Sequence, residues 1–190
     1  MTEQQPYDVV TQFDVVELRR YPEHLVANIH VEGTFDTVGS AAFGALFGYI
    51  SGENESAESI AMTAPVVQQP GSAQSIAMTS PVTQTETEQG WFVVAFVLPH
   101  AMTMNTAPRP TNPKVQLEVM PGGLVAATRF SGLGSASSYA EHRDELVATL
   151  ATAGLTPQGP PRFAQFDAPR TPGSQRRNEV QQPVRDPGNF

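Results

Sequence analysis

The side chains that most often carry out chemistry are few and scattered in this sequence. Its four histidines are His24, His30, His100 and His142, and no two have the spacing with which a helix presents a metal-binding pair. The chain has no cysteine, which excludes disulfides, thiolate catalysis and cysteine-based metal sites. It also lacks a glycine-rich phosphate loop and a Gly-x-Ser-x-Gly motif. The sequence therefore favours a binding protein over an enzyme that supplies its own catalytic groups.

One predicted helix has the residues to bind a flat apolar ligand. Helical periodicity runs from Asp36 to Ile50, with Thr34 or Asp36 as the N-cap and Gly52 as the stop. The apolar arc covers roughly 200° of the circumference, which is wider than a surface helix needs for packing. It comprises Val38, Ala42, Phe43, Ala45, Leu46, Phe47, Tyr49 and Ile50.

Two glycines on the small-residue side of the same helix ought to weaken it. Gly44 and Gly48 each cost about 1 kcal/mol relative to alanine, so we expect something to require their small size. Close packing of the helix against a sheet is one explanation. A flat ligand lying against Phe43, Phe47 and the glycines is the other.

A heptapeptide occurs twice and forms a second signal. Residues 60–66 read IAMTAPV and residues 76–82 read IAMTSPV. Their alternation predicts two strands that bury Met62 and Met78, and the turn residues at 69–72 predict that the strands pair as an antiparallel hairpin. The methionines either fill the core or line a pocket for a large flat ligand, because methionine adapts to irregular apolar shapes.

These elements must be positioned by a fold that repeats itself. The predicted order is a hairpin, a helix and two strands, followed by the same series again. The remaining predicted elements are a hairpin of 14–20 and 25–32, a buried central strand at 91–98, a long loop at 99–113, a hairpin of 114–120 and 124–130, a helix capped by Ser138 and stopped by Gly154, and strands at 162–167 and 176–180. Two such halves can join into one curved sheet or barrel with both helices outside, and a cleft is expected at the seam.

Composition limits the partners and the domain organisation. The net charge is −8, which does not favour non-specific nucleic-acid binding. No apolar run approaches the ~20 residues of a membrane span, and the N-terminal residues do not read as a signal peptide, so we expect a soluble, cytoplasmic protein. We expect one domain at 13–182, an N-terminal extension at 1–12 and a disordered tail at 183–190. The sequence leaves the oligomeric state open.

Three stretches together resemble the SOUL haem-binding family over residues 13–182. They are VELRRYP at 16–22, the IAMTAPV heptapeptide after Gly48-Tyr49-Ile50, and DAPRTP at 167–172 followed by RRNEV at 176–180. The resemblance implies an α+β fold in which a distorted β-barrel, built from two similar halves, is flanked by two helices. That fold is similar to the effector-binding domains of multidrug-responsive regulators.

The resemblance also implies reversible, non-covalent binding of haem or a related tetrapyrrole in a shallow apolar groove, for buffering, transport or delivery. The resemblance implies that members which bind without an axial ligand hold the porphyrin beside the first helix and the C-terminal proline-rich loop. The matching positions are Phe43, Gly44 and Phe47 on the helix and Arg170 in the loop. Here Arg170 replaces an aromatic residue that is common in the family, and a cation there could pair with a propionate.

The family pattern leaves the iron without an obvious ligand in this chain. Some members carry a proposed histidine ligand just before the tyrosine of the first motif, where this chain has Arg20. The remaining candidates are His100, which opens the long loop, and then His30. Two other functions stay open: a module for another apolar or cationic small molecule, with Glu179 as anionic anchor if it faces inward, and an enzyme that acts on bound haem through its iron.

Overall fold

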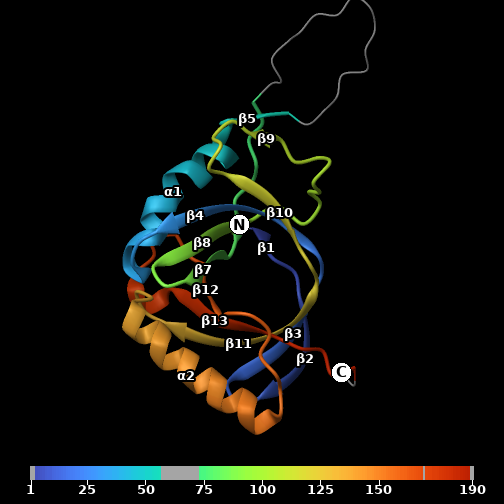
Figure 1. Ribbon diagram of the computed structural model, residues 1–190, viewed down its shortest axis with the longest axis vertical. Coiled ribbons are helices and arrows are strands. Elements are labelled where there is room, and N and C mark those ends of the chain that lie inside the picture. The colour runs from blue at the N-terminus through green and yellow to red at the C-terminus, as the bar shows by residue number, and fades with distance from the viewer. Residues whose placement is uncertain (1–2, 57–72, 169, 189–190) are drawn as a thin grey trace, which may run out of the picture.

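The computed structural model describes residues 3–56, 73–168 and 170–188, and these contain one curled, nine-stranded antiparallel sheet (Figure 1). In spatial order its strands are β10 (Gln116–Met120), β4 (His24–Glu32), β8 (Trp91–Val97), β7 (Val82–Glu88), β12 (Arg162–Gln165), β13 (Arg177–Val184), β11 (Gly123–Ser131), β3 (Val16–Tyr21) and β2 (Asp8–Phe13). Shorter pairs are the parallel β1 (Glu3–Gln4) with β6 (Thr79–Ser80) and the antiparallel β5 (Asn54–Glu55) with β9 (Arg109–Pro110); a single 3-10 turn covers Gly173–Gln175.

Two helices, α1 (Phe35–Ser51) and α2 (Ala136–Ala153), lie outside the curl of the sheet (Figure 1). The predicted ends of α1 are confirmed, since Thr34 is its N-cap and Gly52 its left-handed C-cap, with φ 118°. The predicted cap of α2 is wrong: Ser135, not Ser138, accepts the first-turn N–H, which Ser138 itself donates at 3.3 Å. The predicted stop at Gly154 is confirmed.

Each helix packs on its own part of the sheet and buries its own apolar core. The α1 core includes Val38, Leu46, Ile29, Val94 and Phe96, from α1, β4 and β8. The α2 core includes Leu146, Leu150, Leu124, Phe163 and Val180, from α2, β11, β12 and β13. Because side chains alternate along a strand, the strand residues that lie between these core residues in the sequence point to the opposite, concave face of the sheet.

The two halves show the expected internal symmetry. The first half comprises β4, α1, β7 and β8, and its strands lie in the order β4-β8-β7. The second half comprises β11, α2, β12 and β13, and its strands lie in the corresponding order β11-β13-β12. The halves join where β7 pairs with β12, through Thr83 and Ala164. The predicted distorted barrel with two flanking helices is therefore confirmed.

Both predicted hairpins at the start of the halves are wrong. β3 pairs with β11 rather than with β4, and β10 pairs with β4 rather than with β11, so each half lends a strand to the other. The exchange occurs where two tight turns cross: a Cβ on Gly122 would lie 2.9 Å from the Tyr21 carbonyl oxygen and 3.0 Å from the Glu23 nitrogen. A hairpin prediction from neighbouring strands cannot include this crossing, since it depends on residues far apart in the chain.

Only one copy of the repeated heptapeptide can be compared with the prediction, because residues 60–66 lie outside the described residues. In the second copy Thr79 and Ser80 pair in parallel with β1, and Val82 begins β7, where it pairs with β8 and β12. Ile76 is buried in the α1 core, but Met78 is 38 % exposed, so its predicted burial is wrong. The Ile76 N–H donates to the Ile50 carbonyl at the end of α1 (2.7 Å). This contact with the end of the helix, and not pairing with a partner strand, therefore orients Ile76 and Met78.

The ends of the described chain are more ordered than expected. Pro183 and Val184, which we assigned to a disordered tail, are the last residues of β13, and Val184 is buried opposite Leu124. Beyond them, Asp186 forms an exposed ion pair with Arg20 at 2.9 Å. In the described part of the chain, no helix has the length and hydropathy to cross a bilayer.

Candidate functional site

The beginnings of the two helices meet at the seam between the halves. Asp36, in the first turn of α1, accepts a hydrogen bond from the backbone N–H of Ala136, the first residue of α2, at 3.0 Å. A groove of about 470 Å³ opens beside this contact. Its lining residues are Phe35, Asp36, Gly39, Ser40, Phe43, Gln84, Leu133, Gly134, Ser135, Phe163 and Gln165. A cleft at the seam is what the internal repeat predicts.

An aromatic pair on α1 is left uncovered next to this groove. Phe43 and Phe47 are 36 % and 44 % exposed, while the residues just before them, Ala42 and Leu46, are buried. Their rings stack at 5.5 Å with an interplanar angle of 13°, and the edge of Phe43 meets buried Phe96 at 5.7 Å. The apolar arc of α1 is therefore wider than the core it covers, and the excess forms an exposed aromatic surface.

Gly44 and Gly48, two of the three glycines of α1, differ in their surroundings. A Cβ on Gly48 would lie 2.5 Å from Glu53 Oε2, so the turn after the helix accounts for its small size. Among the described residues, a Cβ on Gly44 would have no atom within 4 Å, apart from its own helix backbone and chain neighbours. Packing inside the protein therefore explains Gly48 but not Gly44, which lies exposed beside Phe43.

The opposite wall of the groove is the loop that leads into α2. Gly134 has φ +71°, and a Cβ there would lie 2.6 Å from Phe163 Cζ, so only glycine lets the loop pass this close to the groove floor. Leu133, beside it, is 70 % exposed. The sequence indicated no role for Leu133 or Gly134, so this second apolar wall had no counterpart among the predictions.

Arg170 belongs to a loop that borders this wall. The Gly173 carbonyl accepts the Gly132 N–H at 3.1 Å, and a Cβ on Gly173 would lie 3.0 Å from Leu133 Cδ2. Arg170 is itself exposed and is not among the groove-lining residues. The structure thus brings the C-terminal loop to the α2 side of the groove, while Phe43, Gly44 and Phe47 lie on the α1 side.

The histidines do not gather at the groove. His30 is exposed on β4 between Ile29 and Val31, which pack against α1, so the alternation of the strand places His30 on the opposite face of the sheet. His100 is exposed in the turn after β8, where its backbone N–H donates to Glu3. Among the described residues, no three histidine or acidic side chains are grouped to hold a metal ion.

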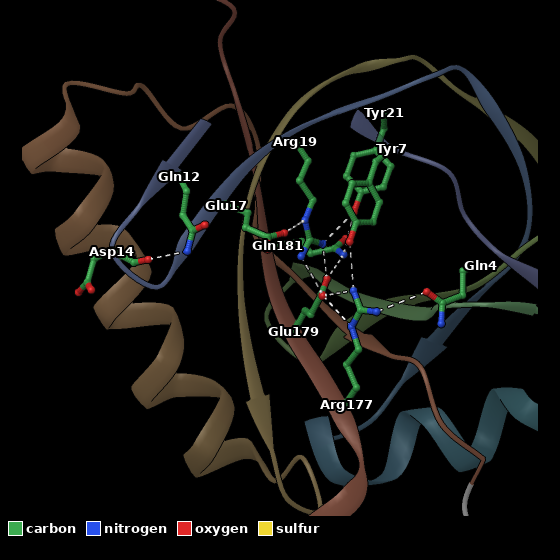
Figure 2. A network of polar contacts seen from close by, with 10 residues as sticks. All are labelled: Gln4, Tyr7, Gln12, Asp14, Glu17, Arg19, Tyr21, Arg177, Glu179 and Gln181. Carbon is green, nitrogen blue, oxygen red and sulfur yellow. Dashed lines mark hydrogen bonds and ion pairs between the residues drawn. The ribbon is translucent and has the colours of Figure 1, made fainter. Parts of the chain in front are cut away.

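The concave face holds a buried polar network centred on Glu179 of β13 (Figure 2). Its carboxylate is fully buried and accepts hydrogen bonds from Arg19 (2.7 and 3.1 Å), Arg177 (2.6 and 3.0 Å) and Gln181 (2.8 Å). Burial alone would raise the pKa of Glu179, but the hydrogen bonds and charges of these partners outweigh it and lower the pKa below its usual value. Glu179 does face inward, yet two guanidinium groups already neutralise it, so it is not a free anchor for a cationic ligand.

The sequence can be compared with known protein families and with curated protein sequences. The model of the SOUL heme-binding protein family matches residues 2–183. This chain belongs to the SOUL family. No curated protein sequence matches it significantly.

Among solved structures, this SOUL protein is similar to the C-terminal domain of EcmrR (TM-score 0.63, 12 % identity, 95 % of this chain and 98 % of that one). It is also similar to a hydrolase from Listeria innocua (TM-score 0.61, 13 % identity, 93 % and 94 %) and to an uncharacterized conserved protein from Listeria innocua (TM-score 0.59, 15 % identity, 90 % and 92 %). At these identities the likeness establishes the shared fold alone.

Proposed function

We propose that this SOUL protein binds haem or a related tetrapyrrole reversibly on the exposed face of α1, for buffering, transport or delivery. The observation that carries the proposal is the stacked, exposed pair Phe43 and Phe47 beside Gly44. Family membership supports the ligand class. A porphyrin is a broad apolar plate, and a flat aromatic surface with an adjacent open glycine is the kind of surface on which such a plate lies closely.

The residues present fit such a group in three respects. The phenyl rings of Phe43 and Phe47 would cover one face of the plate, and the absence of a side chain at Gly44 would let it approach the helix backbone. Leu133 and the groove floor would shield an edge. Arg170, exposed in the bordering loop, would pair with a propionate, because few cations are available in a chain of net charge −8.

The site is better suited to holding the plate than to acting through its iron. His30 lies on the far face of the sheet from α1, and the position of the family's proposed histidine ligand is taken by Arg20. Bound haem would bring its own redox chemistry, while this chain would contribute apolar cover and a charged rim. A carrier that lacks strong protein ligation releases its cargo readily, which fits buffering or delivery.

A haem titration followed by the Soret band tests the proposal on four variants. An apolar contact of this size contributes about 1–3 kcal/mol, so Phe43→Ala and Phe47→Ala should each weaken haem affinity about tenfold or more. Val147→Ala is the matched control, since Val147 is 46 % exposed on α2, away from the groove lining. Arg170→Glu should weaken binding by a smaller factor, because an exposed ion pair contributes little.

Melting temperatures of the same variants separate binding from folding. Because both rings are exposed, Phe43→Ala and Phe47→Ala should leave the melting temperature nearly unchanged. Lower stability with unchanged haem affinity per folded molecule would show that the rings belong to the core and that the tetrapyrrole site lies elsewhere.

A further inference from the structure

The concave face of the sheet contains two adjoining cavities that the tetrapyrrole site does not use. They measure about 200 and 240 Å³, and both are lined by His24, Met120 and Arg162. Drug-sized ligands occupy clefts of about 300–1,000 Å³, so each cavity suits a more compact molecule than a porphyrin.

Arg162 brings an unneutralised positive charge to this place. Its Nε donates to Gln181 Oε1 at 2.8 Å. Within the described ranges, no carboxylate lies at ion-pair distance from its guanidinium, and its two Nη groups make no hydrogen bond. Arg19 and Arg177 on the same face differ, since Glu179 binds both (Figure 2). Burial accordingly lowers the pKa of Arg162, whereas Glu179 outweighs burial and raises the pKa of the other two arginines.

The wall facing the smaller cavity holds a buried acceptor that lacks a donor. Asn28 is 1 % exposed, and its Nδ2 donates to Glu118 Oε2 at 2.7 Å, which fixes the orientation of the amide. Its Oδ1 has no hydrogen-bond partner among the described residues. A buried acceptor without a partner is unfavourable, so a hydrogen-bond donor on a molecule bound in this cavity would stabilise the wall.

The rest of the smaller cavity is apolar or weakly polar. Val26, Ala95 and Val97 form a small buried cluster with Met120 against it, and threonines of β7 complete the wall. The titratable groups that line the two cavities are His24, Glu118, Tyr21 and Arg162. Burial lowers the pKa of His24, so its imidazole is neutral at pH 7 and leaves Arg162 and Glu118 as the charges that face a ligand.

We propose that this concave face binds a small organic carboxylate, with the carboxylate on Arg162, the apolar body on Val26, Ala95 and Val97, and a donor group on Asn28 Oδ1. The guanidinium fork matches a carboxylate with two parallel hydrogen bonds. Glu118, which lines the smaller cavity, would repel a more highly charged anion such as a phosphate, and Glu179 is already neutralised against a cation. This site is separate from the tetrapyrrole surface on the other face of the sheet and does not depend on it.

The test is calorimetric titration of the full chain with 4-hydroxybenzoate, benzoate and 4-hydroxybenzamide. The first carries carboxylate, ring and donor, the second lacks the donor, and the third lacks the charge. We expect 4-hydroxybenzoate to bind most tightly and 4-hydroxybenzamide about tenfold or more weakly, as for loss of a charge-assisted hydrogen bond. Arg162→Met should weaken both carboxylates by a similar factor, and the exposed control Arg185→Met should leave binding unchanged.

Two further variants keep the result interpretable. Arg162→Lys retains the charge without the fork and should fall between the wild type and Arg162→Met. Asn28→Leu should abolish the advantage of 4-hydroxybenzoate over benzoate. Melting temperatures without ligand show which variants fold, since Arg162→Met also removes the hydrogen bond from Arg162 Nε to Gln181. Failure of all three probes to saturate the wild type, equal binding of the amide, or unchanged affinity in folded Arg162→Met would overturn the proposal.

Discussion

Replacing Glu179 by glutamine is the sharpest test of how the concave face is held together. The substitution keeps the shape of the side chain but removes the charge that Arg19 and Arg177 share. Glu179 is 0 % exposed and Arg19 is 2 % exposed, so Arg19 would keep only Glu17, 2.8 Å from its Nε, as a counter-ion and could not be solvated without a rearrangement. Breaking a buried ion pair in this way typically costs about 3–5 kcal/mol. For a protein of this size, the melting temperature should fall by about 6–20 °C.

The pH dependence of this loss follows from the lowered pKa of Glu179. In the unfolded chain the carboxyl titrates near 4.5, and in the folded protein it titrates at a lower pH. Its contribution to stability is therefore fully present above pH 4.5 and is lost as the pH falls through the folded pKa. Urea unfolding of wild type and Glu179→Gln at pH 7 and at successively lower pH should give stability curves that converge in acid.

Two results would contradict this reasoning. A melting temperature within 2 °C of the wild type, taken as roughly 1 kcal/mol or less, would mean that the ion pairs contribute little. Curves that stay parallel down to low pH would mean that Glu179 is not the titrating group. As a control for coupling, the double variant Arg19→Met, Glu179→Gln should lose less stability than the sum of the two single variants, because both remove the same interaction.

Three other substitutions test the groove and its walls. Gly134→Ala should lower the free energy of unfolding in urea by about 1–3 kcal/mol, since residue 134 has φ +71° and its new Cβ would meet Phe163. An unchanged unfolding midpoint would show that the loop shifts to accommodate the methyl group. Gly44→Ala should raise helix stability by about 1 kcal/mol, since no atom hinders the new Cβ, yet weaken haem binding in the Soret titration; equal haem affinity would place the porphyrin away from the helix backbone. His100→Ala should alter the haem spectrum only slightly, and loss of a low-spin spectrum in that variant would identify His100 as an iron ligand.

Local patterns were enough to predict α1 and its surplus of apolar surface. Caps and helical spacing depend on residues a few positions apart, so Thr34, Gly52 and the Phe43–Phe47 pair could be identified from sequence. That these residues bind a tetrapyrrole remains a prediction. The second groove wall at Leu133 and Gly134 could not be foreseen, because it depends on the contact of Gly134 with Phe163 of β12.

Non-local pairing caused the main errors. Adjacent strands joined by a short turn usually form a hairpin, but here β3 and β4 separate at a crossing that also involves Gly122. The buried polar network on the concave face was partly visible in the sequence. Alternate residues of β13, namely Arg177, Glu179 and Gln181, are polar, which places three polar groups on one face of a buried strand. Periodicity predicted that Glu179 could face inward. The pairing with Arg19 of β3 could not be predicted, because it requires the exchanged strand.

That exchange also governs the order in which the protein can form during synthesis. β3 ends at Tyr21, but β11, its neighbour on one side, begins only at Gly123, and β11 in turn needs β13, which ends at Val184. A nascent chain on the ribosome therefore holds β2 and β3 as a two-stranded hairpin without its sheet neighbour until most of the protein has been made. Such distant pairing makes folding slow and leaves unpaired strand edges open to association with other chains. The first half cannot fold to completion before the second has emerged, and so the two halves fold together or not at all.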